Sequence, residues 1–344
     1  MSITLGEIRD QYNAIRRTIE LFDEKKQQIM QFVGVPRCIV LTGCGSSFSL
    51  SCTVRSMASM RLNYPVYALA SGDLWLNCAR YQNMLKDALI ISLSRSGRTS
   101  ELLRAYEAVK KLNVGARFMS LICDEDTPAQ AASDFALCMK WAFDKSVCQT
   151  RCVSNLYTAG ALLIGLLSGD ESIRAGIEKV ARMGEAYMDK CIPQIQKLCE
   201  EDWDRVVVLA DGEIDGLAEE GALAFNEISQ LGSNCYHILD VRHGPMVLIG
   251  KKTLVIAAVK SPTCGYEMAL VDDVLKKGAR VCCYSNLPLE KEGVLGFSLG
   301  EEVGPVAGGL GLIALCQLTS YYKSFQVGCN PDLPDGLDPW IEIR

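Results

Sequence analysis

The chain has 344 residues, of which 49% are hydrophobic and 22% are charged, and its formal net charge is −6. This length accommodates about two domains with separate cores, and the composition is that of an ordinary globular protein rather than a disordered one. The acidic balance disfavours nucleic acid and anionic membranes as partners, and no apolar run reaches membrane-spanning length.

The sixteen cysteines do not form a metal-binding or disulfide pattern. No pair of C-x-x-C elements occurs, and only His237 and His243 could complete a ligand set. Many cysteines lie inside apolar runs, where a thiol acts as a small hydrophobic group. Because no secretory signal is recognisable either, we expect free thiols, no metal site and a reducing, cytoplasmic location.

In chain order, residues 4–33 carry apolar side chains at helical spacing, which predicts a long amphipathic helix ahead of the first domain. Apolar strands are expected at residues 38–41 and 66–70. A glycine- and hydroxyl-rich turn, residues 42–47, follows the first of these strands and leads into a helix. A polar turn, residues 71–73, follows the second strand.

The most informative stretch is residues 89–101. Its apolar strand ends in the run Ser94-Arg95-Ser96-Gly97-Arg98-Thr99, and a segment with apolar residues at helical spacing starts at once. A strand that leads through Ser, Thr and Gly into a helix N-terminus offers unsatisfied N–H groups, a positive dipole end and hydroxyl donors, which suit a phosphate group. The alternative is that Ser96 or Thr99 simply caps the helix.

Strands are next expected at residues 117–123 and 135–141, then a loop at 144–151, an apolar helix at 154–167 and a helical connection at 171–202. Strands that alternate with helices predict the α/β fold class, with a mostly parallel sheet covered by helices on both faces.

The second half of the chain repeats the pattern of the first. Residues 253–262 match the phosphate-loop stretch, but Val259 stands in place of Ser94 and Pro262 in place of Gly97. The hydroxyl-rich loop is therefore lost in the second copy. The sequence predicts two α/β domains of one design and one phosphate site per chain, in the first domain.

The second half also carries a carboxylate and an imidazole that could act together. Glu227 lies in a predicted helix at residues 219–231, and His243 follows in a polar segment with Pro245. Glutamate and histidine are a common acid–base pair near neutral pH. The alternative is that Glu227 is a solvated helix charge and His243 a turn residue. His237, in an apolar strand-like run, is expected to be structural.

Taken together, these motifs resemble those of double sugar-isomerase-domain (SIS) proteins, which include the isomerase half of glucosamine-6-phosphate synthase and the fructosamine-6-phosphate deglycases. The glutamate-to-histidine separation of sixteen residues is the one that the synthases and deglycases show. The resemblance covers essentially the whole chain and rests on four segments in the family's order: the arm at residues 7–15, Cys44-Gly45-Ser46-Ser47, the loop from Ser94 to Thr99, and the pair of segments at residues 220–229 and 242–245.

The resemblance implies two tandem SIS domains, each a flavodoxin-like, three-layer αβα unit: an arm at residues 1–35, a phosphate-binding domain at 36–170 and a catalytic domain at 171–344. It implies Glu227 as the general base and His243 as the group that assists ring opening, often in a neighbouring subunit's site, hence a homodimer. It requires no cofactor. The implied substrate-binding residues are Ser46, Ser47, Ser94, Arg95, Ser96, Thr99, Val147 and Gln149.

The chain also departs from the synthases. No glutaminase domain precedes the arm, and Asp338-Pro339 stands where the synthases carry a C-terminal lysine, so hexosamine synthesis is not expected. Arg95 replaces a glutamine and could strengthen phosphate binding. The resemblance therefore implies an enzyme of carbohydrate or amino-sugar metabolism that is a fructosamine-6-phosphate deglycase or an amino-sugar-phosphate deaminase/isomerase. A plain phosphosugar aldose–ketose isomerase and a non-catalytic sugar-phosphate sensor are the alternatives.

Overall fold

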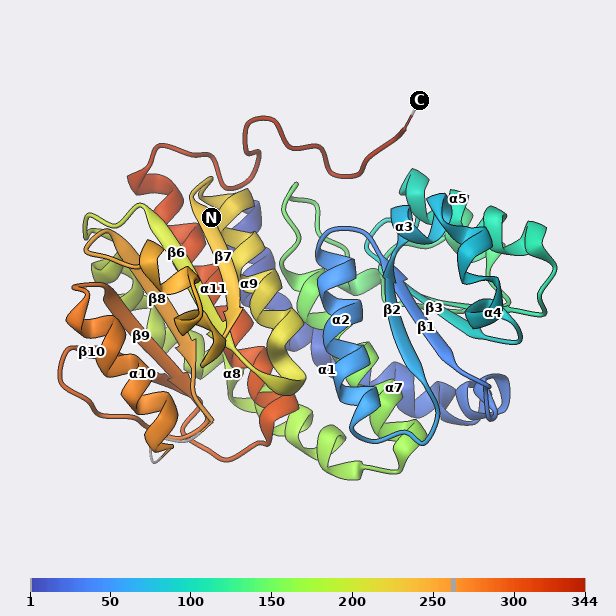
Figure 1. The fold of residues 1–344 in the computed structure, drawn as a ribbon, viewed down its shortest axis with the longest axis horizontal. Coiled ribbons are helices and arrows are strands. Elements are labelled where there is room, and N and C mark those ends of the chain that lie inside the picture. Colours follow the sequence, from blue (N-terminus) through green and yellow to red (C-terminus); the bar gives the residue numbers. More distant parts are fainter. Residues whose placement is uncertain (1, 261–263, 344) are drawn as a thin grey trace. The chain divides into compact units, whose positions relative to one another are not determined.

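The computed structural model describes residues 2–260 and 264–343, which form two α/β units (Figure 1). The first-sheet unit comprises Asn13–Lys145, Gln149–Arg174 and the chain from Asp338 onward. The second-sheet unit comprises the chain up to Tyr12, the short segment Ser146–Cys148, and Ala175–Leu337. The expected replacement of a loop glycine by Pro262 lies outside the described residues.

The first sheet has five strands in the order β2-β1-β3-β4-β5, and all its paired strands are parallel. The strands are nearly continuous apolar runs, as expected for a sheet buried on both faces. Their bounds are β1 Ile39–Gly43, β2 Val66–Ala70, β3 Leu89–Ser94, β4 Arg117–Ile122 and β5 Phe135–Cys138.

Helices cover both faces of this sheet. On one face α2 packs against β1, β2 and β3, with α7 behind it. On the other face α3 and α5 share a core with β1, β3 and β4, built around Leu74, Tyr106 and Phe118. The helices of this unit are α2 Ser46–Ser59, α3 Ser71–Leu76, α4 Gln82–Leu85, α5 Ser100–Leu112, α6 Pro128–Ala132 and α7 Arg151–Ser168. Two longer helices, α1 Ile3–Val33 and α8 Glu171–Cys199, are divided between the units.

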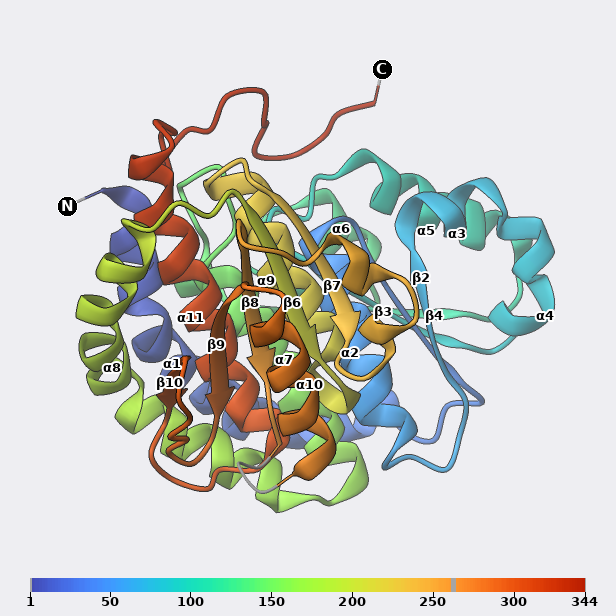
Figure 2. The same ribbon diagram turned by 60° about the vertical axis from the view of Figure 1, so that its left-hand side comes forward.

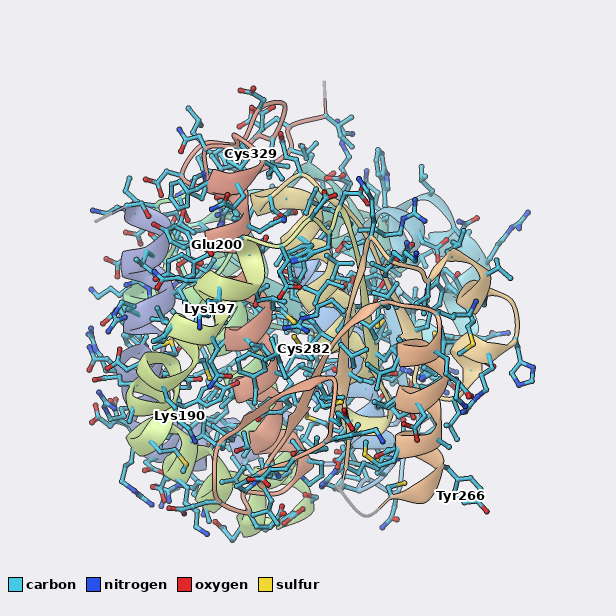
Figure 3. All side chains as sticks on the ribbon, turned by 90° about the vertical axis from the view of Figure 1, so that its left-hand side faces the viewer. Lys190, Lys197, Glu200, Tyr266, Cys282 and Cys329 are labelled. Atoms are coloured by element: carbon cyan, nitrogen blue, oxygen red, sulfur yellow. The ribbon has the colours of Figure 1, made fainter. Side chains whose placement is uncertain are left out.

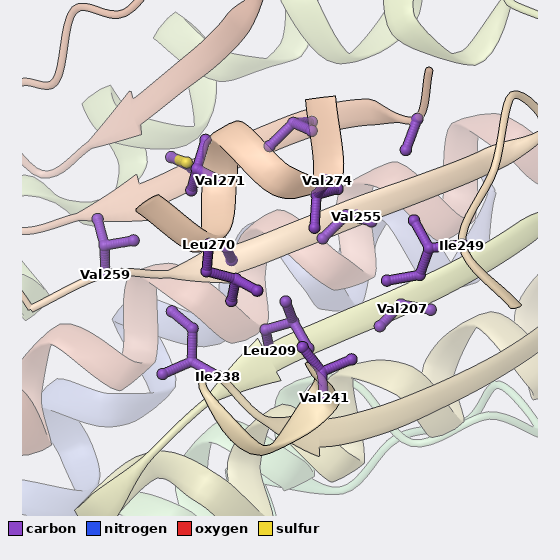
Figure 4. Packing of buried hydrophobic residues seen from close by; sticks show 14 of the residues in the cluster. Val207, Leu209, Ile238, Val241, Ile249, Val255, Val259, Leu270, Val271 and Val274 are labelled. Carbon is purple, nitrogen blue, oxygen red and sulfur yellow. The ribbon is translucent and has the colours of Figure 1, made fainter. Parts of the chain in front are cut away.

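The second sheet has the equivalent order, β10-β9-β8-β6-β7, and its paired strands are also parallel. Figure 2 shows α10 crossing one of its faces. Leu270, Val271 and Val274 of α10 pack there against β6 and β8 residues such as Leu209 and Val255 (Figure 4). The elements are β6 Arg205–Ala210, β7 Gly232–His237, β8 Thr253–Ala258, β9 Arg280–Ser285, β10 Val294–Ser298, α9 Asp215–Ile228, α10 Gly265–Lys276 and α11 Pro305–Gln326.

Side-chain placement follows the amphipathic patterns of the sequence. Lys190 and Lys197 lie on the exposed side of α8, whereas Cys282 is buried in β9 (Figure 3). All sixteen cysteines are free, as expected, and burial raises the pKa of Cys282 and Cys316 well above that of an ordinary thiol. Within the described ranges, no helix is long and apolar enough to cross a membrane.

Two of the local expectations were wrong. Residues 71–73 form the first turn of α3 rather than a polar turn, because burial of Leu74 against α5 outweighs the turn preference of Ser, Gly and Asp. The strand expected at residues 135–141 ends at Cys138 and is followed by a short 3-10 helix, Lys140–Ala142.

Candidate active site

The first sheet has a switch point between its two central strands. β1 and β3 are parallel neighbours, so their carboxyl ends meet at one edge of the sheet. The chain leaves β1 into α2 on one face and leaves β3 into α5 on the other. In open α/β sheets, ligands bind in the crevice that such a divergence creates.

The loop after β1 brings serine hydroxyls to this edge. Gly45 has φ +53°, and α2 starts directly after it with Ser46 and Ser47, both of which are buried. The Ser46 hydroxyl is only 2% exposed and has no hydrogen-bond partner among the described residues. A buried, unpartnered hydroxyl is costly unless a ligand pairs with it. Burial raises the pKa of the adjacent Cys44 thiol to about 11, so this group stays protonated.

The loop after β3 is held in a turn by its own serines. The Ser94 hydroxyl accepts the Gly97 N–H at 2.9 Å, and the Ser96 hydroxyl accepts the Arg98 N–H at 3.2 Å. Gly97 has φ +61°, and a Cβ there would lie 2.4 Å from Oγ1 of Thr127. Only glycine fits this position without strain.

Both loops end in helix N-termini whose N-cap residues, Gly45 for α2 and Thr99 for α5, make no side-chain cap. Some first-turn N–H groups are already paired: those of Ser47 and Phe48 donate to the Cys44 and Gly45 carbonyls. The positive dipole ends of the two helices favour an anion at these loops.

A small pocket of about 30 Å³ lies between the two loops. It brings together six of the eight predicted binding residues; Ser46 and Val147 are not among those that line it. Val147 belongs instead to the second-sheet unit, where its N–H donates to the Asp332 carbonyl. The pocket is lined by Cys44, Ser47, Leu93, Ser94, Arg95, Ser96, Thr99, Leu102, Gln149 and Pro339.

The segment Asp338–Ile343 closes the pocket. The Arg95 guanidinium, which is only 4% exposed, donates to the Pro339 carbonyl. The Ser100 N–H, in the first turn of α5, donates to the Ile341 carbonyl at 3.3 Å. The sequence places Pro339 where the synthases carry a C-terminal lysine, but its contact with Arg95 was not predicted, because no local pattern indicates a contact with a loop more than 200 residues earlier in the chain.

The predicted acid–base residues both lie in the second-sheet unit. Glu227 is partly exposed near the end of α9, between Ala224 and Ile228, which pack against Cys148. His243 is exposed and follows the 3-10 helix Asp240–Arg242.

Ion pairs lie beside both histidines. Arg242, the neighbour of His243, pairs with Asp273 at 2.8 Å, and this hydrogen bond lowers the pKa of Asp273. The Nδ1 atom of His237 lies 3.0 Å from Oδ1 of Asp211, and the side chain is 59% exposed. The described residues contain no cluster of three or more metal-ligating side chains.

The two parallel α/β units have the fold class that the motifs predict. The solved structure of tagatose-6-phosphate ketose/aldose isomerase from Escherichia coli matches with a TM-score of 0.86 at 22% identity, covering 100% of this chain and 96% of that one.

No family model matches the chain, but its sequence relatives are also named as enzymes of sugar 6-phosphates. The chain is 26% identical, over 86% of its length and 77% of the relative's, to the D-galactosamine-6-phosphate deaminase AgaS of Shewanella sp.. It is 24% identical, over 99% of its length, to the isomerizing glutamine–fructose-6-phosphate aminotransferase of Methanothermobacter thermautotrophicus, of which it spans only 57%.

Proposed function

We propose that the chain is an enzyme that binds a hexose or hexosamine 6-phosphate and moves a proton between its first two carbons. The observation that carries this proposal is the pocket at the β1/β3 switch point, with its buried Arg95 and its serine and threonine hydroxyls. The names of the three relatives given above refer to a hexose or hexosamine 6-phosphate, which supports the same substrate class.

The phosphate would be held by Arg95 and by hydroxyls and N–H groups at the starts of α2 and α5. A guanidinium and helix N-termini are strong partners for a phosphate dianion, and a buried site increases the strength of each contact. The substrate-binding residues we propose are Ser46, Ser47, Ser94, Arg95, Ser96, Thr99, Val147 and Gln149.

The chemistry would use Glu227 as general base and His243 as the group that opens the sugar ring and delivers protons. Glu227 removes the proton from the carbon beside the C=O or C=N group, which gives an enediol or enaminol. Return of that proton to the neighbouring carbon completes an aldose–ketose exchange. Hydrolysis of a C=N group then releases ammonia in a deaminase or a larger amine in a deglycase.

The experiment is turnover on a panel of hexose, hexosamine and fructosamine 6-phosphates. Glu227→Gln should lower the rate roughly 100- to 10,000-fold while inorganic phosphate still binds. Glu219→Gln, an exposed change on the same helix, is the matched control and should turn over normally. The released product identifies isomerase, deaminase or deglycase. Binding without turnover, and without solvent deuterium exchange at the sugar, would indicate a sensor instead.

We also propose that the protein works as a homodimer in which His243 completes the partner's site. Exposed Leu239, Val247 and Leu248 flank this histidine and offer an apolar contact surface. Mixing the inactive variants Glu227→Gln and His243→Asn should then restore about a quarter of wild-type activity, because half of the subunits enter hybrids with one intact site. No restoration would assign His243 to its own subunit's site.

We also propose a cellular location and a division of the chain into domains. A reducing, cytoplasmic location is supported by the sixteen free cysteines. Tandem domains at residues 36–170 and 171–344, preceded by an arm at 1–35, are supported by the equivalent strand orders of the two sheets, which also favour an internal duplication.

A further inference from the structure

One buried carboxyl group near the phosphate pocket has no part in the chemistry proposed above. Asp144 lies in the loop between β5 and α7, and its side chain is fully buried. Burial raises the pKa of Asp144, and hydrogen bonds from Cys152 and Thr150 partly offset that rise. A buried carboxyl group is costly, so its contacts indicate what it does.

Asp144 caps the helix that follows. Its Oδ2 accepts the Thr150 N–H at 2.7 Å and the Cys152 N–H at 2.9 Å, at the start of α7. Thr150, the N-cap residue, does not cap the helix with its own side chain. Asp144 therefore caps α7 through Oδ2, and its other oxygen, Oδ1, lies 3.8 Å from the Arg151 guanidinium.

The capped segment includes a residue of the pocket. Gln149 lines the pocket and directly precedes Thr150. The Cys152 thiol donates to Oε1 of Gln149 at 3.2 Å, and the backbone N–H of the same residue donates to Asp144. Burial raises the pKa of Cys152 well above that of an ordinary thiol, so its sulfur carries a proton to donate. Because Oε1 of Gln149 accepts this hydrogen bond, the NH2 group of the same amide is the part that can face the pocket.

We propose that Asp144 is a positioning residue of the phosphate pocket, which acts through Thr150 and Cys152 to fix the Gln149 amide with its NH2 group toward the ligand. This inference rests on the proposed function. An amide N–H donor suits a phosphate oxygen, whereas the reversed amide would present an oxygen to an anion.

The test compares two helix-capping aspartates that lie at opposite ends of α7. Asp170 accepts the Ser172 N–H at 3.1 Å at the start of α8 and pairs with Arg61 at 2.9 Å. Because α7 has 18 residues, Asp170 lies about 25 Å along the helix from the pocket. Asp144→Leu and Asp170→Leu should both lower the thermal midpoint, since each removes a cap. Only Asp144→Leu should change the affinity for inorganic phosphate.

Calorimetric titration of the full chain with inorganic phosphate gives the readout. Asp144→Leu should weaken binding about tenfold, the loss of one hydrogen bond to a charged group. Asp144→Asn should restore most of the affinity, because a single oxygen accepts both N–H groups in the native structure. Gln149→Ala should match Asp144→Leu, and the double variant should be no weaker than either single one.

Three outcomes would overturn the inference: unchanged phosphate affinity in Asp144→Leu, an equal loss in Asp170→Leu, or additive losses with Gln149→Ala. If Asp144→Leu does not fold, Cys152→Ala takes its place in the test. Cys152→Ala should weaken phosphate binding as much as Gln149→Ala does, and Cys152→Ser should restore the affinity. Wild-type affinity in Cys152→Ala would refute the proposal. Wild-type protein that binds no phosphate would instead refute the proposed function, and this inference with it.

Discussion

Replacing the phosphate-loop glycine Gly97 with alanine should destabilise the protein more than the same change at Gly169, the residue that follows α7. Gly97 has φ +61° and Gly169 has φ +73°, so both variants place an L-residue at positive φ. That conformation costs roughly 1–2 kcal/mol. The two positions differ in what a Cβ would meet: Thr127 at 2.4 Å for Gly97, and nothing within 4 Å for Gly169.

Steric overlap of that kind adds about 1–3 kcal/mol when the neighbour is held in place. The Thr127 side chain is held, since it accepts the Gln130 N–H at the start of α6. We therefore expect Gly169→Ala to lower the free energy of unfolding by about 1–2 kcal/mol and Gly97→Ala to lower it by about 2–5 kcal/mol.

Urea unfolding followed by circular dichroism measures both values. Thr127→Ala provides an internal check, because it removes the hydroxyl at 2.4 Å and leaves the Thr127 Cβ, at 2.8 Å, near the added carbon. Alone it should cost about 1 kcal/mol through loss of the α6 cap, but in the Gly97→Ala background it should cost less, because part of the steric overlap is relieved. Equal losses for Gly97→Ala and Gly169→Ala would show that close approach to Thr127 does not constrain the loop.

Three further outcomes are expected. Hydrogen bonds from Ser172 and Arg61 lower the pKa of Asp170. The contribution of Asp170 to stability is therefore present above the ordinary carboxyl pKa and is lost as pH falls through the lowered value. The difference in urea midpoint between wild type and Asp170→Asn should be constant near neutral pH and should disappear below about pH 4. Removal of the residues after Leu337 frees Arg95 from the Pro339 carbonyl and should tighten inorganic phosphate binding in a titration, whereas weaker binding would make that segment part of the site. A thiol reagent should leave buried cysteines such as Cys316 unmodified until urea unfolds the protein, and rapid modification of every thiol at neutral pH would contradict this packing.

Much of the fold could be predicted from local patterns. The strand Val66–Ala70 has the predicted bounds, because it is a continuous apolar run that directly follows Pro65. The pocket was predictable for a similar reason. Its serines and Arg95 directly follow the carboxyl end of β3, and neighbouring parallel strands bring such loops to one edge.

The parts that could not be predicted depend on contacts distant in sequence. Pro339 reaches the pocket only because the chain returns to the first-sheet unit after Leu337. Asp144 appears in the sequence as one charge in a polar loop, and only the fold buries it under the start of α7. Its role follows from desolvation and hydrogen-bond geometry, neither of which is a property of the neighbouring residues.

The second sheet has a glycine at the matching place but different residues around it. β6 corresponds to β1 in the strand order, and Gly212 with φ +71°, like Gly45 with φ +53°, is the second residue after its strand. Gly212 opens a short 3-10 helix, Gly212–Ile214, whereas α2 starts directly after Gly45. On either side of Gly212 stand Asp211 and Glu213, where the first loop carries Cys44 and Ser46. Because two carboxylates beside this turn would repel a phosphate dianion, the difference agrees with our proposal of one phosphate site per chain, in the first-sheet unit.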